Sequence, residues 1–189
     1  MIRIGIVGDI GSGKSFVANN FGYPVFNADH EVSKLYREDK KVYFKLKKKL
    51  PKYIYAFPID KNEVTKAILA KPNNLKKIIN IVHKEIRKKM NLFIKKNKHK
   101  KIVVLDIPLL LENKINEKED VLIFIDSTAA HIEKKLKKRA NFNRKLYNKF
   151  KKIQYSKMYK KKKSNFIIKN NFTKKSVEKG IKEVLNQIL

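Results

Sequence analysis

The stretch Gly8-Asp9-Ile10-Gly11-Ser12-Gly13-Lys14-Ser15 decides the fold that we predict for this chain. It matches the pattern G-x-x-x-x-G-K-[ST] in full, between an apolar run that ends at Val7 and a helical pattern that begins near Lys14. Glycines let such a loop fold closely around a phosphate group, so that backbone N–H groups point inward, and the following helix N-terminus adds partial positive charge. The stretch therefore predicts a strand, a phosphate-binding loop and a helix in succession.

The side chains of this loop predict contacts with ATP and a metal ion. Lys14 should reach the β- and γ-phosphates, and the Ser15 hydroxyl should ligate Mg²⁺. The full set of residues expected to bind ATP is Gly8, Gly11, Ser12, Gly13, Lys14, Ser15 and Phe16. Because the motif alone specifies only nucleotide binding, the reaction has to be inferred from the rest of the chain.

Short apolar runs alternate with helical patterns along the 189 residues, which is typical of an α/β fold. Continuous apolar runs suit buried parallel strands, so we predict a parallel five-stranded sheet. The predicted strands are Ile2–Val7, Pro24–Asn27, Ile102–Asp106, Val121–Ile125 and Phe166–Ile168. The predicted helices are Lys14–Phe21, Asp29–Arg37, Lys61–Ala70, Asn73–Lys96, Ala129–Ala140, Arg144–Tyr159 and Ser176–Ile188.

The distribution of these patterns predicts one domain, 1–189, with two specialised parts. Residues 29–100 contain no convincing strand, so we expect a mainly helical insertion that could hold a second substrate. Residues 137–163 are basic, helical and poor in branched aliphatic residues, which suits either a mobile lid over phosphates or a plain surface helix. The nucleotide-binding core then comprises 1–28, 101–136 and 164–189.

The composition limits the classes of partner. Lys and Arg outnumber Asp and Glu by 47 to 17, and a net charge of +30 would ordinarily suggest a nucleic-acid partner. The lysines are spread over almost every amphipathic segment, however, and no aromatic-rich RNA-binding signature or DNA-reading motif is present, so we predict a solvated surface that also attracts anionic substrates. No apolar run approaches the roughly 18 residues of a membrane span, and no signal-peptide order or cysteine is present, which favours a cytoplasmic location without a membrane partner. The sequence predicts no oligomeric state.

Two aspartates end or follow predicted strands. Asp29 follows the second strand, and ligands of open α/β sheets bind at the carboxyl edge. A carboxylate there can orient a hydroxyl group and accept its proton, although Asp29 could equally cap the helix that starts beside it. Asp106 ends the run Ile102–Leu105, which is typical of a Walker B strand whose acid helps to hold Mg²⁺, the alternative being a solvated acid at a strand end.

Arg139 and Arg144 are notable because arginine is scarce beside lysine in this chain. The planar guanidinium group suits bidentate contact with phosphate and neutralisation of charge in a transition state. Either residue could also be one more solvated cation.

The order of these motifs resembles the dephospho-CoA kinase family over nearly the whole chain. The phosphate loop is similar to that family's G-G-I-G-S-G-K-S, and Asn27-Ala28-Asp29 resembles its D-A-D element. The remaining matches are Val82-His83 with the His-Pro step, Leu105–Glu112 with the Asp-x-Pro-Leu-Leu-x-Glu region, Arg139, Arg144 and Gln154 with the lid, and Ile168–Asn171 with the final strand and Asn turn.

This resemblance implies a P-loop kinase that transfers the γ-phosphoryl group of ATP to the 3′-hydroxyl of dephospho-CoA, giving coenzyme A and ADP. It implies that Asp29 is the base and that Lys14, Arg139 and Arg144 act on the transferred group. The helical insertion would hold dephospho-CoA, and the lid would close over ATP and exclude water. Two other functions remain open at this point: a P-loop kinase of nucleotides or other small metabolites, and an ATP-binding protein associated with nucleic acid.

Four residues depart from the family pattern. Asp9 and Phe172 stand where glycine is usual, Asn27 replaces the first acid of D-A-D, and Lys84 replaces a proline. Asp9 is the most conspicuous of these, because it adds a negative charge beside a loop that has to bind anions. We expect Asp9 to weaken anion binding unless its side chain points outward.

Overall fold

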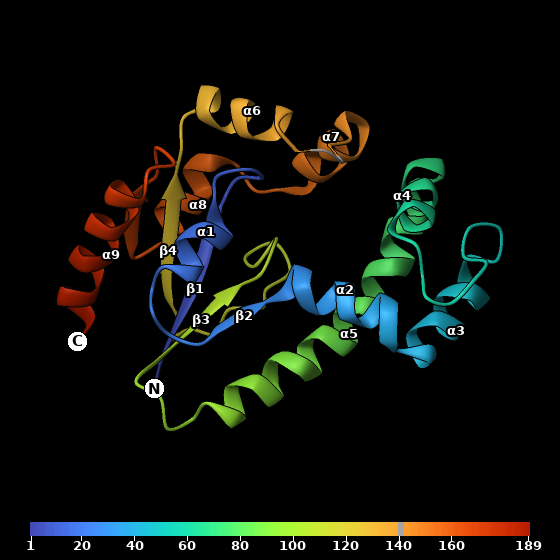
Figure 1. Ribbon diagram of the computed structural model, residues 1–189, viewed down its shortest axis with the longest axis horizontal. Coiled ribbons are helices and arrows are strands. Elements are labelled where there is room, and N and C mark those ends of the chain that lie inside the picture. Colours follow the sequence, from blue (N-terminus) through green and yellow to red (C-terminus); the bar gives the residue numbers. More distant parts are fainter. Residues whose placement is uncertain (140–141) are drawn as a thin grey trace. The chain divides into compact units, whose positions relative to one another are not determined.

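The computed structural model describes residues 1–139 and 142–189 (Figure 1). The strands are β1 (Ile2–Gly8), β2 (Val25–Asn27), β3 (Ile102–Asp106), β4 (Val121–Asp126) and β5 (Phe166–Lys169). The helices are α1 (Lys14–Asn19), α2 (Ala28–Glu38), α3 (Lys40–Lys49), α4 (Lys61–Ala70), α5 (Pro72–Lys96), α6 (Ala129–Lys137), α7 (Arg144–Ile153), α8 (Lys157–Lys163) and α9 (Lys174–Ile188).

The chain forms two compact units. The first, which we call the core unit, comprises Met1–Asn27 and Asn97–Leu189, and the second, the helical unit, comprises Ala28–Lys96. The core unit contains every strand of the sheet and the phosphate loop, whereas the described elements of the helical unit are all helices. Each unit is described by itself below.

The core unit is built on a five-stranded sheet with the order β2-β3-β1-β4-β5, and all of its strands run parallel. This confirms the α/β fold and the parallel five-stranded sheet predicted from the apolar runs. Gly8 pairs with Ile125 and Asn27 pairs with Asp106, so the carboxyl ends of four strands meet at one edge. Because β1 lies in the middle of the sheet, the phosphate loop emerges at the centre of this edge.

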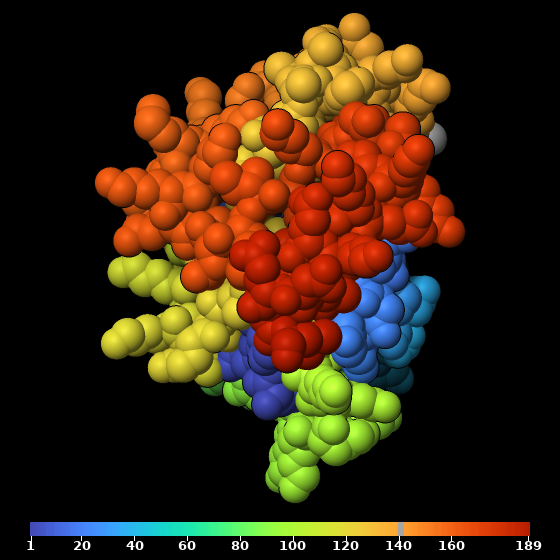
Figure 2. Space-filling view, turned by 90° about the vertical axis from the view of Figure 1, so that its left-hand side faces the viewer, coloured from blue at the N-terminus to red at the C-terminus, as the bar shows by residue number. Residues whose placement is uncertain are grey.

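Side chains along β1 point alternately to the two faces of the sheet, and helices pack against them. Ile4 and Ile6 are fully buried in a cluster that also contains Val17 and Ala18 of α1 and Val177 of α9. Helix α8 packs against β1 and β4. Residues from the last third of the chain, coloured orange to red, make up much of the face of the core unit seen in Figure 2. The phosphate loop is therefore anchored by a strand that is buried on both sides.

The helical unit is organised around α5. Its buried residues Ile78, Val82, Ile86 and Met90 recur every four positions and so form one apolar stripe. Helices α2, α3 and α4 all pack against α5. Helix α3 was missed in the sequence, although Asp39 supplies a cap signal: its side chain accepts a hydrogen bond from Val42 N.

The predicted helix Arg144–Tyr159 was wrong as one element, because the chain forms α7 and α8 with a break between them. Gln154 is the C-cap of α7, and Ser156 caps α8 by accepting a hydrogen bond from Tyr159 N. The predicted end of the preceding helix at Ala140 lies outside the described residues. Within 1–139 and 142–189, no helix combines the length and apolar character needed to cross a membrane.

Candidate active site

The phosphate loop requires glycine for steric reasons that the structure makes specific. Gly11 and Gly13 have φ values of 86° and 87°, a left-handed conformation that costs side-chain-bearing residues energy. A Cβ atom on Gly13 would lie 2.4 Å from Asn170 Nδ2. The loop therefore has a tight backbone path that other residues could adopt only with distortion.

Within the loop, Lys14 and the start of α1 are arranged for anions. Lys14 Nζ donates hydrogen bonds to the carbonyl oxygens of Gly8 (3.1 Å) and Asp9 (2.9 Å), which holds the ammonium group against the loop. The N–H groups in the first turn of a helix have no partner within that helix, and here they include those of Ser15 and Phe16. Ser12 is 1% exposed, and its Oγ has no hydrogen-bond partner among the described residues. Positive charge and N–H donors thus converge on one loop, as phosphate binding requires.

Asn170 and Ser127 brace the loop from the ends of the neighbouring strands. Asn170 Nδ2 donates to the carbonyl oxygen of Ser12 at 2.9 Å, and Ser127 Oγ lies 2.9 Å from the same oxygen. Phe172 then has φ 66°, and its N–H donates to Asn170 Oδ1. The left-handed backbone at Phe172 explains why glycine is usual there, since glycine adopts this conformation without strain.

Asp106 lies at the end of β3 and is 3% exposed. Its Oδ2 accepts a hydrogen bond of 2.6 Å from Asn27 Nδ2, the residue opposite it in register on β2. An aspartate at position 27 would bring two carboxylates together, whereas the amide can donate to Asp106. The Asn27 departure therefore gives Asp106 an amide donor where the family pattern would place a second carboxylate.

Asp9 is bound by a residue that the sequence analysis missed. Lys160 of α8 is 1% exposed, and its Nζ lies 2.5 Å from Asp9 Oδ1. Lys160 belongs to the run Lys160–Lys163, and nothing in such a run distinguishes the buried lysine from the solvated ones. The only signal was the unexplained acid in the loop, which called for a cationic partner.

Further contacts connect the α7–α8 segment to the loop and to the sheet edge. Ile10 N donates to Gln154 Oε1 at 3.4 Å, and Tyr155 N donates to Glu112 Oε1 at 2.8 Å. Lys157 Nζ lies 2.7 Å from Asp126 Oδ1. Burial raises the pKa of the Asp126 carboxyl, but the hydrogen bond and charge of Lys157, with a smaller contribution from Lys161, outweigh this and hold the pKa below its usual value.

A cavity of about 520 Å³ lies beside the loop, within the core unit. Arg144 contributes to its lining, with its guanidinium group 5.2 Å from the Phe142 ring centroid and 5.8 Å from that of Tyr147. Asp9 and Gln154 line the same cavity. Arg139 follows α6, is exposed and does not line this cavity, so of the two predicted arginines only Arg144 is brought to it.

Asp29 belongs to the helical unit, where it lies in the first turn of α2. An acid at this place interacts favourably with the helix dipole whatever its other role.

His83 lies on α5 of the same unit, where burial, with the nearby charge of Arg87, lowers the pKa of its imidazole. Both effects favour the neutral imidazole at His83.

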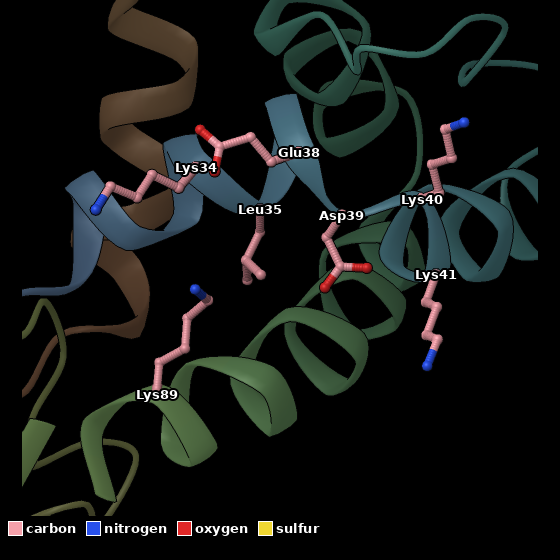
Figure 3. A pocket seen from close by; sticks show the side chains of 7 residues that line it. All are labelled: Lys34, Leu35, Glu38, Asp39, Lys40, Lys41 and Lys89. Atoms are coloured by element: carbon pink, nitrogen blue, oxygen red, sulfur yellow. The ribbon is translucent and has the colours of Figure 1, made fainter. Parts of the chain in front are cut away.

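The helical unit has a cavity of its own, of about 570 Å³ (Figure 3). In Figure 3, Leu35 and Asp39 point from the α2 side toward α5, and Lys89 points from α5 toward α2. The cavity is lined by Lys34, Leu35, Glu38, Asp39, Lys40, Lys41 and Lys89. Four lysines against two acids give it a net positive lining.

The donor set for a metal ion is sparse. Within the described parts of the chain, no group of three or more His, Cys, Asp or Glu side chains is placed to hold a metal ion. Magnesium in phosphoryl-transfer sites is commonly bound through one or two carboxylates together with substrate phosphates and water. Asp106 and the exposed Ser15 hydroxyl fit that kind of site.

Comparison with known proteins identifies relatives along almost the entire chain. A family model described as Dephospho-CoA kinase matches residues 2–176. A dephospho-CoA kinase from Wolbachia pipientis wMel is 34% identical over 190 residues, which cover 98% of this chain and 97% of that relative. Among solved structures, a Thermus thermophilus protein is 25% identical with a TM-score of 0.77, covering 100% of this chain and 98% of its own. The dephospho-CoA kinase from Campylobacter jejuni, 21% identical with a TM-score of 0.64, covers 98% of this chain and 96% of its own and supports the fold.

Proposed function

The chain belongs to the dephospho-CoA kinase family, and from this premise we propose which of its residues carry the reaction. A dephospho-CoA kinase uses ATP to phosphorylate dephospho-CoA; we assign the acceptor group as the 3′-hydroxyl. The products are then coenzyme A and ADP. From the family we also expect a cytoplasmic location and no nucleic-acid partner.

The phosphate loop binds ATP in this proposal. In this proposal Lys14 exchanges its hydrogen bonds to the carbonyl oxygens of Gly8 and Asp9 for contacts with the β- and γ-phosphates. The backbone of Gly8 to Phe16 surrounds the phosphates with N–H donors. The complete loop, with Lys14 held against it and Asn170 bracing it, is the observation that carries the proposal.

Asp106 and Ser15 would hold Mg²⁺ beside the phosphates. Magnesium supplies charge neutralisation of the β- and γ-phosphate oxygens. Asp106 keeps one carboxylate oxygen on Asn27 Nδ2, and this contact fixes the orientation of the carboxyl group. Asp106 therefore acts mainly through the metal, whereas Lys14 acts on the phosphates directly.

Residues 137–163 form the lid. Arg144 lines the cavity that contains Asp9, and there its guanidinium can approach the transferred phosphoryl group and stabilise its charge. Arg139 has the same role in the family pattern, and because it is exposed it would have to move to the phosphates as the lid closes. We thus expect Arg144 to contribute more to ATP binding than Arg139.

Asp29 is the general base in this proposal. It follows β2 after Ala28, and so it continues from the strand whose Asn27 contacts Asp106. A carboxylate in that place can orient the acceptor hydroxyl and take its proton. The helical unit would hold dephospho-CoA, and its net positive cavity suits the anionic groups of that substrate.

A coupled assay of ADP release with dephospho-CoA tests the acceptor and the base together. We expect the wild-type chain to form coenzyme A and ADP, and we expect Asp29→Asn to lower kcat by about 10²- to 10⁴-fold with little change in KM for ATP. Efficient phosphorylation of a nucleoside monophosphate with none of dephospho-CoA would reject the proposed reaction. Retained turnover in Asp29→Asn would reject only the base.

The cavity of the helical unit is tested by Lys41→Met. Removing one cation from its lining should raise KM for dephospho-CoA severalfold while KM for ATP stays the same. Lys76→Met removes an exposed lysine of the same unit that does not line the cavity, and it serves as the matched control. Equal effects of the two substitutions on KM for dephospho-CoA would mean that this substrate does not bind in the cavity.

A further inference from the structure

Asp9 stands between two cations of the core unit. Its backbone carbonyl oxygen accepts a hydrogen bond from Lys14 Nζ at 2.9 Å, and its side-chain Oδ1 binds Lys160 Nζ at 2.5 Å. The Lys160 side chain is 1% exposed, whereas the Asp9 side chain is 34% exposed. A single loop residue is therefore in contact with the lysine that we assign to the phosphates and with a buried lysine of α8.

We propose that Asp9 and Lys160 form a charge-compensating pair that fits the phosphate loop for ATP, with Lys160 as a positioning residue acting through Asp9. This inference rests on the proposed function, because it assumes that the loop binds the phosphates of ATP. It assigns a role to a residue that the reaction itself does not use.

The charges of Asp9 and Lys160 would each be unfavourable without the other. A carboxylate at Asp9 without a partner would repel the phosphates, and a buried ammonium at Lys160 without a partner would be strongly destabilising. Together they leave no net charge at this point of the loop. The positive charge presented by the loop then comes from Lys14 and the N–H donors, as in a loop with glycine at this position.

The surroundings of Lys160 fix the pair in place. Helix α8 packs against β1 and β4, and Ser164 Oγ donates to the Lys160 carbonyl oxygen at 2.9 Å. Lys160, Gly8, Lys14 and Gln154 line one small cavity beneath the loop. Since Gln154 also accepts a hydrogen bond from Ile10 N, the lid segment holds two consecutive loop residues, Asp9 and Ile10.

The test compares Lys160→Met, Asp9→Asn and the double variant by calorimetric titration with ATP and, separately, with AMP. Lys160→Met leaves the Asp9 carboxylate unpaired, so we expect about tenfold or greater loss of ATP affinity. The loss for AMP should be much smaller, because charge repulsion grows with the charge of the ligand. Adding Asp9→Asn to Lys160→Met should recover ATP affinity to within about threefold of the wild type.

Three results would overturn the pairing. One is equal loss of ATP affinity in Lys160→Met and in the double variant, which would mean that Lys160 acts independently of Asp9. Another is equal loss for AMP and ATP, which would mean a purely structural role. The third is a double variant that fails to fold, which would show that folding requires Lys160 even when position 9 carries no charge.

Two further variants keep the test decisive if Lys160→Met does not fold. Lys160→Arg keeps the cation and should bind ATP within about threefold of the wild type, and its failure to do so would count against the pair. Lys162→Met, an exposed lysine of the same helix, should not change ATP binding. A wild-type chain that does not bind ATP would overturn the proposed function, whereas normal ATP binding and transfer without coupling between Asp9 and Lys160 would overturn only this inference.

Discussion

Lys160 of the core unit and the pair Lys45 and Lys88 of the helical unit are used in opposite ways. In the core unit, Lys160 is 1% exposed and binds an acid of the phosphate loop from another part of the chain. In the helical unit, Lys45 and Lys88 are 51% and 60% exposed and share the single acid Glu85 on the surface. The same residue type thus serves a buried contact beside the proposed active site in one unit and a solvated ion pair in the other.

The difference shows why a net charge of +30 says little about function. Acids are few in this chain, and their positions determine which lysines are held in place. Asp9 and Asp126 hold Lys160 and Lys157 around the phosphate loop and the sheet edge. Exposed lysines contribute charge at the surface, where they attract anions.

The largest effect that would test this contrast is expected at Lys14. Lys14→Ala removes the cation assigned to the β- and γ-phosphates, and we expect phosphoryl transfer to fall by on the order of 10³-fold or more while the chain stays folded. Steady-state kinetics and circular dichroism measure the two properties. Lys45→Ala is the matched control in the helical unit and should leave kcat within about twofold of the wild type. Near-normal turnover in Lys14→Ala would overturn the assignment of Lys14 to the phosphates.

Much of the fold could be predicted from the sequence, because the strands β1, β3 and β4 are largely buried and read as continuous apolar runs. β3, for example, is buried at every position from Ile102 to Asp106. Helix α3 was missed because its lysines obscure the apolar stripe of Val42, Tyr43 and Leu46. The break between α7 and α8 was missed because the cap at Ser156 lies inside a long helical pattern.

The candidate site was predictable only as far as its motifs reach. The glycine-rich loop specifies its own geometry, and Asp106 ends an unambiguous strand. Lys160 could not be found, since its burial follows from the packing of α8 on β1 and β4, which no local pattern contains. The roles of Lys14, Ser15, Asp106, Asp29, Arg139 and Arg144 all remain predictions.

Substitution of Asp126, whose carboxyl group pairs with Lys157, should have an effect on stability that is smaller than the effect of Lys14→Ala on catalysis. Its pKa is lowered in the folded chain, so its contribution to stability is present above the pKa of an unfolded aspartate and is lost as the pH falls through the lower folded pKa. We expect Asp126→Asn to lower the free energy of unfolding by about 1 kcal/mol at pH 7, and we expect the difference from the wild type to shrink toward pH 3. Urea titrations at several pH values measure this.

The control for that experiment is Glu178→Gln, which affects an exposed pair with Lys174 on α9. We expect its effect at pH 7 to be within about 0.5 kcal/mol of zero. If Asp126→Asn destabilised the chain equally at pH 3 and pH 7, the contribution of Asp126 would come from packing or neutral hydrogen bonds. The charge of the Asp126–Lys157 pair would then not be what stabilises the fold at this place.

The smallest effect is expected at Glu85, which binds Lys45 at 3.2 Å and Lys88 at 3.1 Å. Hydrogen bonding to Lys88 lowers the pKa of Glu85 against the opposing effect of burial, and a hydrogen bond to Lys45 adds to the lowering. Because both lysines are more than half exposed, water and salt screen the pairs, and we expect Glu85→Gln to cost only about 0.5 kcal/mol at low salt. At about 1 M salt, where the screening length is near 3 Å, the cost should vanish, and the cost of Asp126→Asn, whose partner Lys157 is 48% exposed, should fall as well. Chemical denaturation with urea at both salt concentrations measures the two variants, and a cost of Glu85→Gln that stays the same at about 1 M salt would mean that its pairs with Lys45 and Lys88 do not contribute through screened charge.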